Sequence, residues 1–97
     1  DGIAIATAAM IAIGCQQYKT CNNGRCPVGI GTQDPELRKR FDIEKSSKRL
    51  ENYFNAVNDE LRTFARMTGN DDIHKLSNYD IVTTNDDISK YTNIKHV

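Results

Sequence analysis

The chain has 97 residues, enough for one small domain. Its 13 basic and 13 acidic residues cancel, so no net charge draws it to nucleic acid or to an anionic membrane. Its one strongly apolar stretch, residues 3–14, is too short to cross a bilayer and lacks the basic flank of a secretory signal. We therefore predict a cytoplasmic protein with no nucleic-acid and no membrane partner. Because the chain begins at Asp1 without an initiator Met, we expect it to be part of something longer.

The first predicted element is a buried β-strand that leads into a short helix. Residues 2–7 alternate large and small apolar side chains without a charge, which is typical of a strand in a parallel sheet. Residues 8–13 suit a short helix with Gly14 as its C′ residue. The rest of the chain offers no partner strand, so we expect the neighbouring strands to lie outside it. The low charge of residues 1–33 predicts burial, against this chain or against something larger.

Two helices are predicted in the middle of the chain. Asp34 as N-cap and Pro35 at the first helical position start a short helix that ends near Phe41. A longer helix follows over residues 43–68 and is ended by Gly69. Apolar residues recur along it at spacings of three and four, which predicts one apolar stripe made of Leu50, Phe54, Val57, Leu61, Phe64 and Ala65.

The last part of the chain is predicted to hold short helices and loops only. Ser77 and Asp80 have the spacing of a capping box, which predicts a short helix that includes residues 79–82. Asp86 or Asp87 is expected to cap a last helical turn through residues 88–91.

Three cysteines lie close together, in the pattern Cys15-x5-Cys21-x4-Cys26, and Pro27 follows the last of them. An odd number in so short a window is a poor disulfide framework, so a reducing compartment fits better. Free cysteines are often small buried hydrophobic residues, but the neighbours here are largely polar.

Two kinds of metal site remain open for these cysteines. Structural zinc usually brings CxxC pairs and four ligands, whereas this loop has no CxxC pair and no nearby His. Three thiolates in a loop with Gly and Asn, and a Cys followed by Pro, fit an iron–sulfur cluster. The spacing alone places iron–sulfur slightly ahead of zinc, with buried structural cysteines close behind.

Residues 15–35, CQQYKTCNNGRCPVGIGTQDP, closely resemble the cluster loop of glutamate synthases and their archaeal FMN-binding relatives. Residues 5–14 resemble the last barrel strand and the helix after it. Residues 52–69 and 73–76 resemble the helical tail behind the cluster. The resemblance therefore extends over nearly the whole chain.

The resemblance implies an α/β fold: the C-terminal fragment of an FMN-binding (β/α)8 TIM barrel, followed by a mostly α-helical tail. Residues 1–14 would be the last β/α unit, residues 15–33 the iron–sulfur cluster loop, and residues 34–97 the C-terminal helical extension. Cys15, Cys21 and Cys26 would hold a 3Fe–4S cluster. The backbone at Ala6, Thr7 and Ala8 would approach the FMN phosphate, as at other barrel phosphate sites; Thr7 also suits an N-cap.

The implied activity is that of a glutamate synthase. A ferredoxin or an NAD(P)H-dehydrogenase-type donor would supply electrons through the cluster to FMN, and the reduced flavin would convert 2-iminoglutarate to glutamate. The remainder of the FMN barrel, in the same or a separate chain, would hold most of the flavin, and no acid–base residue is assigned here. An N-methylglutamate synthase-type enzyme would have nearly the same sequence over this stretch.

Two alternatives of other classes are a free-standing small iron–sulfur electron carrier and a zinc-binding interaction module. An unpaired apolar strand at residues 3–7 argues against the free-standing carrier, because an isolated strand edge favours aggregation. The basic run Arg38, Lys39 and Arg40 is interpreted as a solvated helix face, with a docking patch for an acidic ferredoxin as the alternative.

Overall fold

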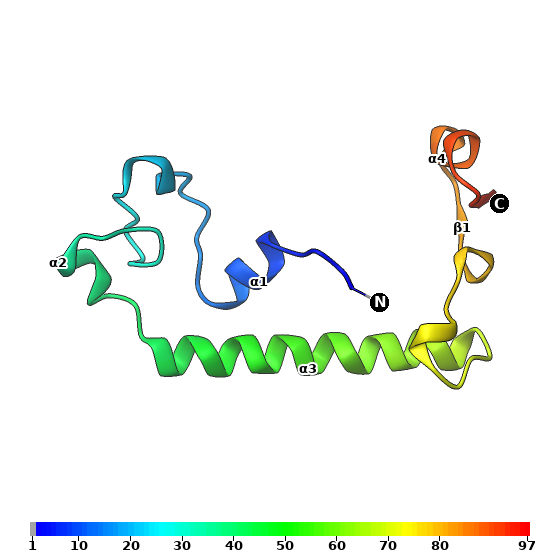
Figure 1. Cartoon of the computed structure of the whole chain (residues 1–97), viewed down its shortest axis with the longest axis horizontal. Coiled ribbons are helices and arrows are strands. Elements are labelled where there is room, and N and C mark those ends of the chain that lie inside the picture. The colour runs from blue at the N-terminus through cyan, green and yellow to red at the C-terminus, as the bar shows by residue number, and fades with distance from the viewer. Residues whose placement is uncertain (1) are drawn as a thin grey trace. The chain divides into compact units, whose positions relative to one another are not determined.

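The computed structural model describes residues 2–97, which form two compact units, residues 2–56 and residues 57–97. Figure 1 shows the elements. In chain order they are α1 (Thr7–Ala12), the 3₁₀ helix η1 (Cys21–Asn23), α2 (Pro35–Arg38), α3 (Ile43–Met67), the 3₁₀ helices η2 (Ile73–Lys75) and η3 (Asn78–Asp80), β1 (Val82–Thr83), α4 (Asp86–Tyr91) and β2 (Lys95–His96). None of the helices in the described part of the chain is both long and apolar enough to span a membrane.

The chain enters α1 without a preceding strand in the described residues. Residues 2–6 have no regular secondary structure. A barrel strand at residues 2–7 would pair with strands that we expect outside this chain. That strand therefore stays a prediction. The N-cap is Ala6, which makes no side-chain hydrogen bond, and Thr7 is already the first helical residue. The expected N-cap role of Thr7 is therefore wrong.

The end of α1 matches the prediction that Gly14 is its C′ residue. The N–H of Gly14 donates to the carbonyl of Ile11 at 2.9 Å, and the N–H of Cys15 donates to the carbonyl of Met10 at 3.0 Å. These two bonds are the pair that defines a Schellman motif. The first cysteine is therefore held by its backbone directly at the end of α1.

Burial in the first unit is concentrated in the cysteine loop, which we define as residues 15–33. Among residues 2–56, the buried residues are Cys26, Gly29, Thr32 and Ser46, and all but the last belong to this loop. The apolar side chains around α1 are not covered within the chain; Ile3, for example, is 83% exposed. Within the described residues, the predicted burial of the first third is therefore met in this chain only at Cys26, Gly29 and Thr32, and elsewhere it would need a surface outside this chain.

Helix α2 starts as predicted. The Asp34 carboxylate accepts hydrogen bonds from the backbone N–H groups of Glu36 at 2.8 Å and Leu37 at 3.2 Å, and Pro35 takes the first helical position. The helix ends at Arg38, earlier than the predicted end near Phe41, and two turn bonds continue the chain to Phe41.

Replacing Asp34 by Ala is expected to lower the free energy of unfolding by about 1 kcal/mol, because two N–H groups lose their acceptor. Asp34→Asn, which keeps a side-chain oxygen in the same place, is expected to lose much less. Urea denaturation of the two variants measures the difference, and equal losses would contradict the capping role.

Helix α3 runs over residues 43–67, within one residue of the predicted end. A second Schellman motif ends it: Gly69 donates to Arg66 at 3.1 Å and Asn70 donates to Ala65 at 2.8 Å. The predicted apolar stripe is only partly covered. Ala65 is 4% exposed, but Phe64 beside it is 56% exposed. The stripe therefore keeps apolar surface that this chain does not bury.

The prediction that the last part of the chain holds only short helices and loops is wrong, because the second unit also contains two short strands. The capping box of Ser77 and Asp80 is confirmed, but the helix it starts is the single turn η3, and Ile81 is already extended. Val82 pairs with Lys95 in the two-residue parallel pair β1–β2. The β-branched run from Ile81 to Thr84 explains the change, because such residues favour strands.

Helix α4 connects the two short strands and has a different cap from the one predicted. The side chain of Asn85 accepts hydrogen bonds from the N–H groups of Asp87 at 2.9 Å and Ile88 at 3.2 Å. Asn85 is therefore the N-cap, and Asp86 and Asp87 lie in the first turn. Their negative charge is favourable there because of the helix dipole.

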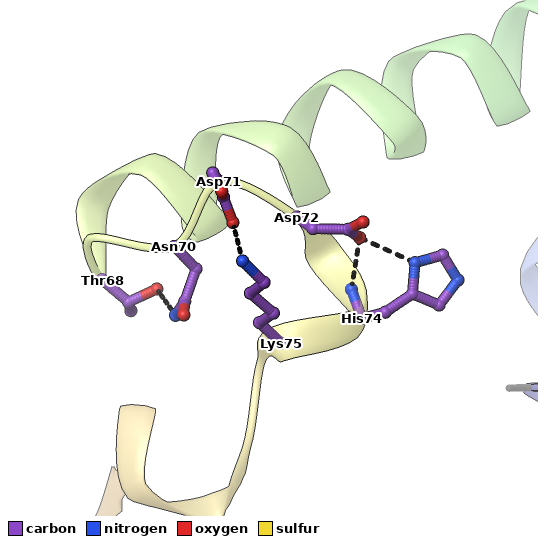
Figure 2. Close-up of polar contacts among 6 residues, drawn as sticks. All are labelled: Thr68, Asn70, Asp71, Asp72, His74 and Lys75. Carbon is purple, nitrogen blue, oxygen red and sulfur yellow. Dashed lines mark hydrogen bonds and ion pairs between the residues drawn. The ribbon is translucent and has the colours of Figure 1, made fainter.

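The turn after α3 is held by short-range polar contacts, which Figure 2 shows. One oxygen of Asp72 accepts the backbone N–H of His74 at 2.8 Å and lies 2.7 Å from its ring Nδ1. The His74 N–H is the main reason that the pKa of the Asp72 carboxyl lies below its ordinary value. The Lys75 ammonium donates to Asp71 at 2.5 Å. A cavity of about 530 Å³ lies beside this turn, and its lining is mostly polar: Asn58, Arg62, Ala65, Arg66, Asn70, Asp71, Asp72 and Ile73.

Candidate functional site

A cavity of about 430 Å³ in the first unit brings the three cysteines together. Cys15, Cys21 and Cys26 all line it, and so do Ala6 and Thr7 from the start of α1. Ala8 is not among the lining residues. The remaining wall is formed by Met10, Gln16, Gln17, Tyr18, Lys19, Thr20 and Val28. The residues that the sequence suggested for a cluster and for a flavin phosphate therefore lie, with the exception of Ala8, around one space.

Cys26 is buried, whereas Cys15 is half-buried and Cys21 is exposed. The side chain of Cys26 is 8% exposed. The backbone amides of residues 28–31, that of Gly31 first, hold the pKa of the Cys26 thiol below its ordinary value. Burial opposes this effect but does not cancel it. The loop therefore stabilises the thiolate, which is the form of cysteine that binds metals.

The lowered pKa gives a testable pH dependence. In metal-free protein, the alkylation rate of Cys26 is expected to rise with pH and to reach its half-maximum at a lower pH than in the unfolded chain, because the pKa of its thiol is lowered. After unfolding in denaturant, the N–H groups no longer face the sulfur, so the midpoint should move up to the ordinary value. Peptide mass spectrometry of Cys26 at a series of pH values measures both midpoints, and identical midpoints would contradict the stabilisation.

Cys21 and Cys26 share one neighbour, the backbone of Gly31. The Cα of Gly31 lies so close to Cys21 that an added methyl group would be 3.3 Å from its Cβ and 3.7 Å from its sulfur. The N–H of the same glycine faces Cys26. The backbone of Gly31 thus lies against Cys21 and also lowers the pKa of Cys26.

Cys15 receives one backbone donor and is followed by unusual backbone. Its sulfur accepts the N–H of Gln17 at 3.4 Å. Gln17 and Lys19 have φ of 55° and 56°, a region that residues other than Gly rarely adopt. Such positions cost about 1–3 kcal/mol each and concentrate at functional sites. The backbone between Cys15 and Cys21 is therefore a strained part of the loop.

The three cysteine thiols suit one kind of metal site better than another. In the part of the chain that the structure describes, no three His, Cys, Asp or Glu side chains are arranged to hold a single metal ion. A three-iron cluster makes a different demand, because each cysteine binds its own iron. Three free thiols around one cavity fit the ligand type of such a cluster, and the Gln17 N–H on the Cys15 sulfur is a sulfur hydrogen bond of the kind found at such clusters.

Several features of this site could not be predicted from side-chain types. The N–H donors of residues 28–31 belong to the backbone, and so does the donor of Gln17. The pattern Cys-Pro-Val-Gly carries a partial signal, because Pro27 second and Gly29 fourth are favoured positions in a tight turn. The structure forms that turn, with the Gly29 N–H donating to the Cys26 carbonyl at 3.1 Å.

Comparisons with known proteins agree with the resemblance noted in the sequence. The chain matches the family described as "Conserved region in glutamate synthase" over residues 1–71. A glutamate synthase large subunit-like protein of Rhizobium meliloti is 36% identical, over 84% of this chain and 22% of the relative. The archaeal glutamate synthase [NADPH] of Methanocaldococcus jannaschii is 40% identical, over 78% of this chain and 15% of the relative. The glutamate synthase [NADH] of Schizosaccharomyces pombe is 42% identical, over 73% of this chain and 3% of the relative.

This chain spans less than a quarter of the length of these relatives. No solved structure gives a significant match.

Proposed function

Because this chain belongs to the glutamate synthase family, we propose that it forms the iron–sulfur part of a glutamate synthase-type oxidoreductase. Cys15, Cys21 and Cys26 are the proposed ligands of a 3Fe–4S cluster. When bound, the cluster supplies electron transfer to FMN, for the reduction of 2-iminoglutarate to glutamate. The chain is one portion of the catalytic unit, and the remainder of the FMN barrel, in the same or a separate chain, completes it.

The observation that carries the proposal is the common cavity of the three cysteines. The backbone of residues 28–31 favours the Cys26 thiolate, and the Gln17 N–H donates to Cys15. Hydrogen bonds to sulfur are among the factors that set the potential of an iron–sulfur cluster. This chain's own contribution is therefore to supply three thiolates and to fix their surroundings.

The start of α1 is the proposed flavin edge of the site. Ala6 and Thr7 line the same cavity as the cysteines, and Ala8 follows them in the first turn of α1. The first N–H groups of a helix have no partner within it and can bind a phosphate. We assign the backbone of these three residues to the FMN phosphate, which would place the flavin close to the cysteine loop.

The electron donor is proposed to be a ferredoxin or an NAD(P)H-dehydrogenase-type protein, in the cytoplasm. Two relatives carry NADPH and NADH in their names, which supports a pyridine nucleotide as the ultimate source of electrons.

Metal and flavin analysis tests the proposal. The natural protein is purified without oxygen, and its iron, acid-labile sulfide, zinc and flavin are quantified. We expect iron and sulfide in the ratio of a 3Fe–4S cluster, and FMN in the same preparation. Zinc without sulfide would contradict the proposal and favour an interaction module.

A further inference from the structure

We propose that Arg40 is a positioning residue for Cys26: its guanidinium holds the turn that carries this cysteine and thereby slows loss of the cluster. The part of this inference that concerns the cluster rests on the proposed function. The part that concerns the position of Cys26 rests on the hydrogen bond of Arg40 alone. It concerns the segment 37–41, the end of α2 and the turn after it, which packs on the cysteine loop.

The backbone of this segment lies directly against the turn formed by residues 26–29. A methyl group on Gly29 would come within 2.4 Å of the Leu37 carbonyl oxygen and 3.2 Å of both the N and the Cβ of Phe41. Contacts this close leave no room for a side chain at Gly29. The turn after Cys26 is therefore fitted onto the end of α2, and Arg40 lies within that same segment.

Arg40 adds a polar contact to this packing. Its Nη1 donates to the carbonyl oxygen of Pro27 at 3.2 Å, across 13 positions of the chain. Pro27 immediately follows Cys26. A guanidinium keeps its charge at any physiological pH and presents its donors in a rigid plane. The contact thus fixes the carbonyl next to the cysteine and brings a permanent positive charge to that side of the site.

The three basic residues are exposed, as predicted, but they differ in the contacts that they make. Arg38 donates to the side chain of Gln33, also in the cysteine loop, at 3.4 Å. Lys39 instead pairs with Glu36 of α2 at 2.6 Å and does not contact the loop through this ion pair. Two of the three basic side chains therefore contact the loop, and the third supplies a matched control of equal charge.

Two consequences follow for the proposed cluster. Loss of the Arg40 contact loosens the turn that holds one of three ligands, so iron should leave faster. Loss of its positive charge disfavours the more negative, reduced state, so the reduction potential should fall. A residue that only stabilised the fold would not move the potential in intact protein.

The test compares Arg40→Met with Lys39→Met, both in the natural protein with its cluster. Iron release to a chelator is expected to be about three- to tenfold faster in Arg40→Met, the effect of losing one hydrogen bond. The potential of the cluster is expected to become more negative in the same variant. Lys39→Met should behave like the wild type, and Arg40→Lys, which keeps the charge, should recover most of the potential. Equal release rates in the two Met variants would overturn the proposal.

A second readout separates this proposal from the proposed function. If the wild-type protein holds no cluster, the proposed function fails, but the position of Cys26 can still be measured in the metal-free protein. The alkylation rate of Cys26 at a pH well above its pKa then reports access to the sulfur. We expect the rate to increase in Arg40→Met and not in Lys39→Met; the same rate in both would overturn the role of Arg40.

Discussion

Replacing Gly29 by Ala is expected to destabilise the cysteine loop by about 3 kcal/mol and to prevent full loading of the cluster. Gly29 has φ of +86°, which costs a residue with a Cβ about 1–2 kcal/mol. The new methyl group would also lie 2.4 Å from the Leu37 carbonyl oxygen. Because that oxygen belongs to the backbone, the loop and the end of α2 must separate, at a further cost of about 1–3 kcal/mol.

Gly24 provides the matched control for this variant. Its φ of +70° is similar, but nothing lies within 4 Å of a methyl group placed on it. Gly24→Ala should therefore cost only the backbone term, about 1 kcal/mol. Urea denaturation and iron content measured on both variants give the comparison. If the two substitutions have the same effect, the packing of Gly29 on residues 37–41 does not contribute to stability.

Replacing Cys21 by Ala is expected to abolish the cluster and to leave much of the bound FMN. One iron loses its protein ligand, whereas most flavin contacts are expected outside this chain. Iron, sulfide and flavin analysis of the purified variant measures both effects. Thr20→Ala, a change at a neighbouring cavity residue that has no thiol, should keep the cluster. A full complement of cluster in Cys21→Ala would remove Cys21 from the ligand set.

The elements that the sequence predicted correctly depend on residues within one helical turn of each other. Asp34 caps α2 because the two N–H groups that donate to its carboxylate are two and three positions away. Gly14 and Gly69 end their helices through bonds that cross three and five positions. Such signals are local, so composition and spacing are enough to find them.

The features that were missed depend on residues far apart in the chain. Val82 joins a strand because Lys95 lies beside it, and nothing near Val82 indicates that partner. Arg40 is exposed, as predicted, but its charge gave no sign of the hydrogen bond to the Pro27 carbonyl, 13 positions away. The spacing of the three cysteines and the family resemblance together indicated a cluster site. The backbone amides of residues 28–31, which lower the pKa of Cys26, depend on how the turn after Cys26 is folded.

The exposed apolar surface of the chain has a related explanation. Ile3 and Phe64 remain largely exposed, although their sequence patterns predict burial. A pattern shows that a side chain favours burial, but not which surface covers it. The prediction of a final barrel strand at residues 2–7 depends on such a surface, so the secondary structure of this chain alone does not test it.

Electron paramagnetic resonance of the natural protein, purified without oxygen and then oxidised, tests the central claim most directly. We expect the signal typical of an oxidised three-iron cluster, with FMN in the same preparation, and loss of that signal in Cys21→Ala. A spectrum without this signal, together with zinc or no metal in place of iron and sulfide, would contradict the assignment of Cys15, Cys21 and Cys26 as cluster ligands.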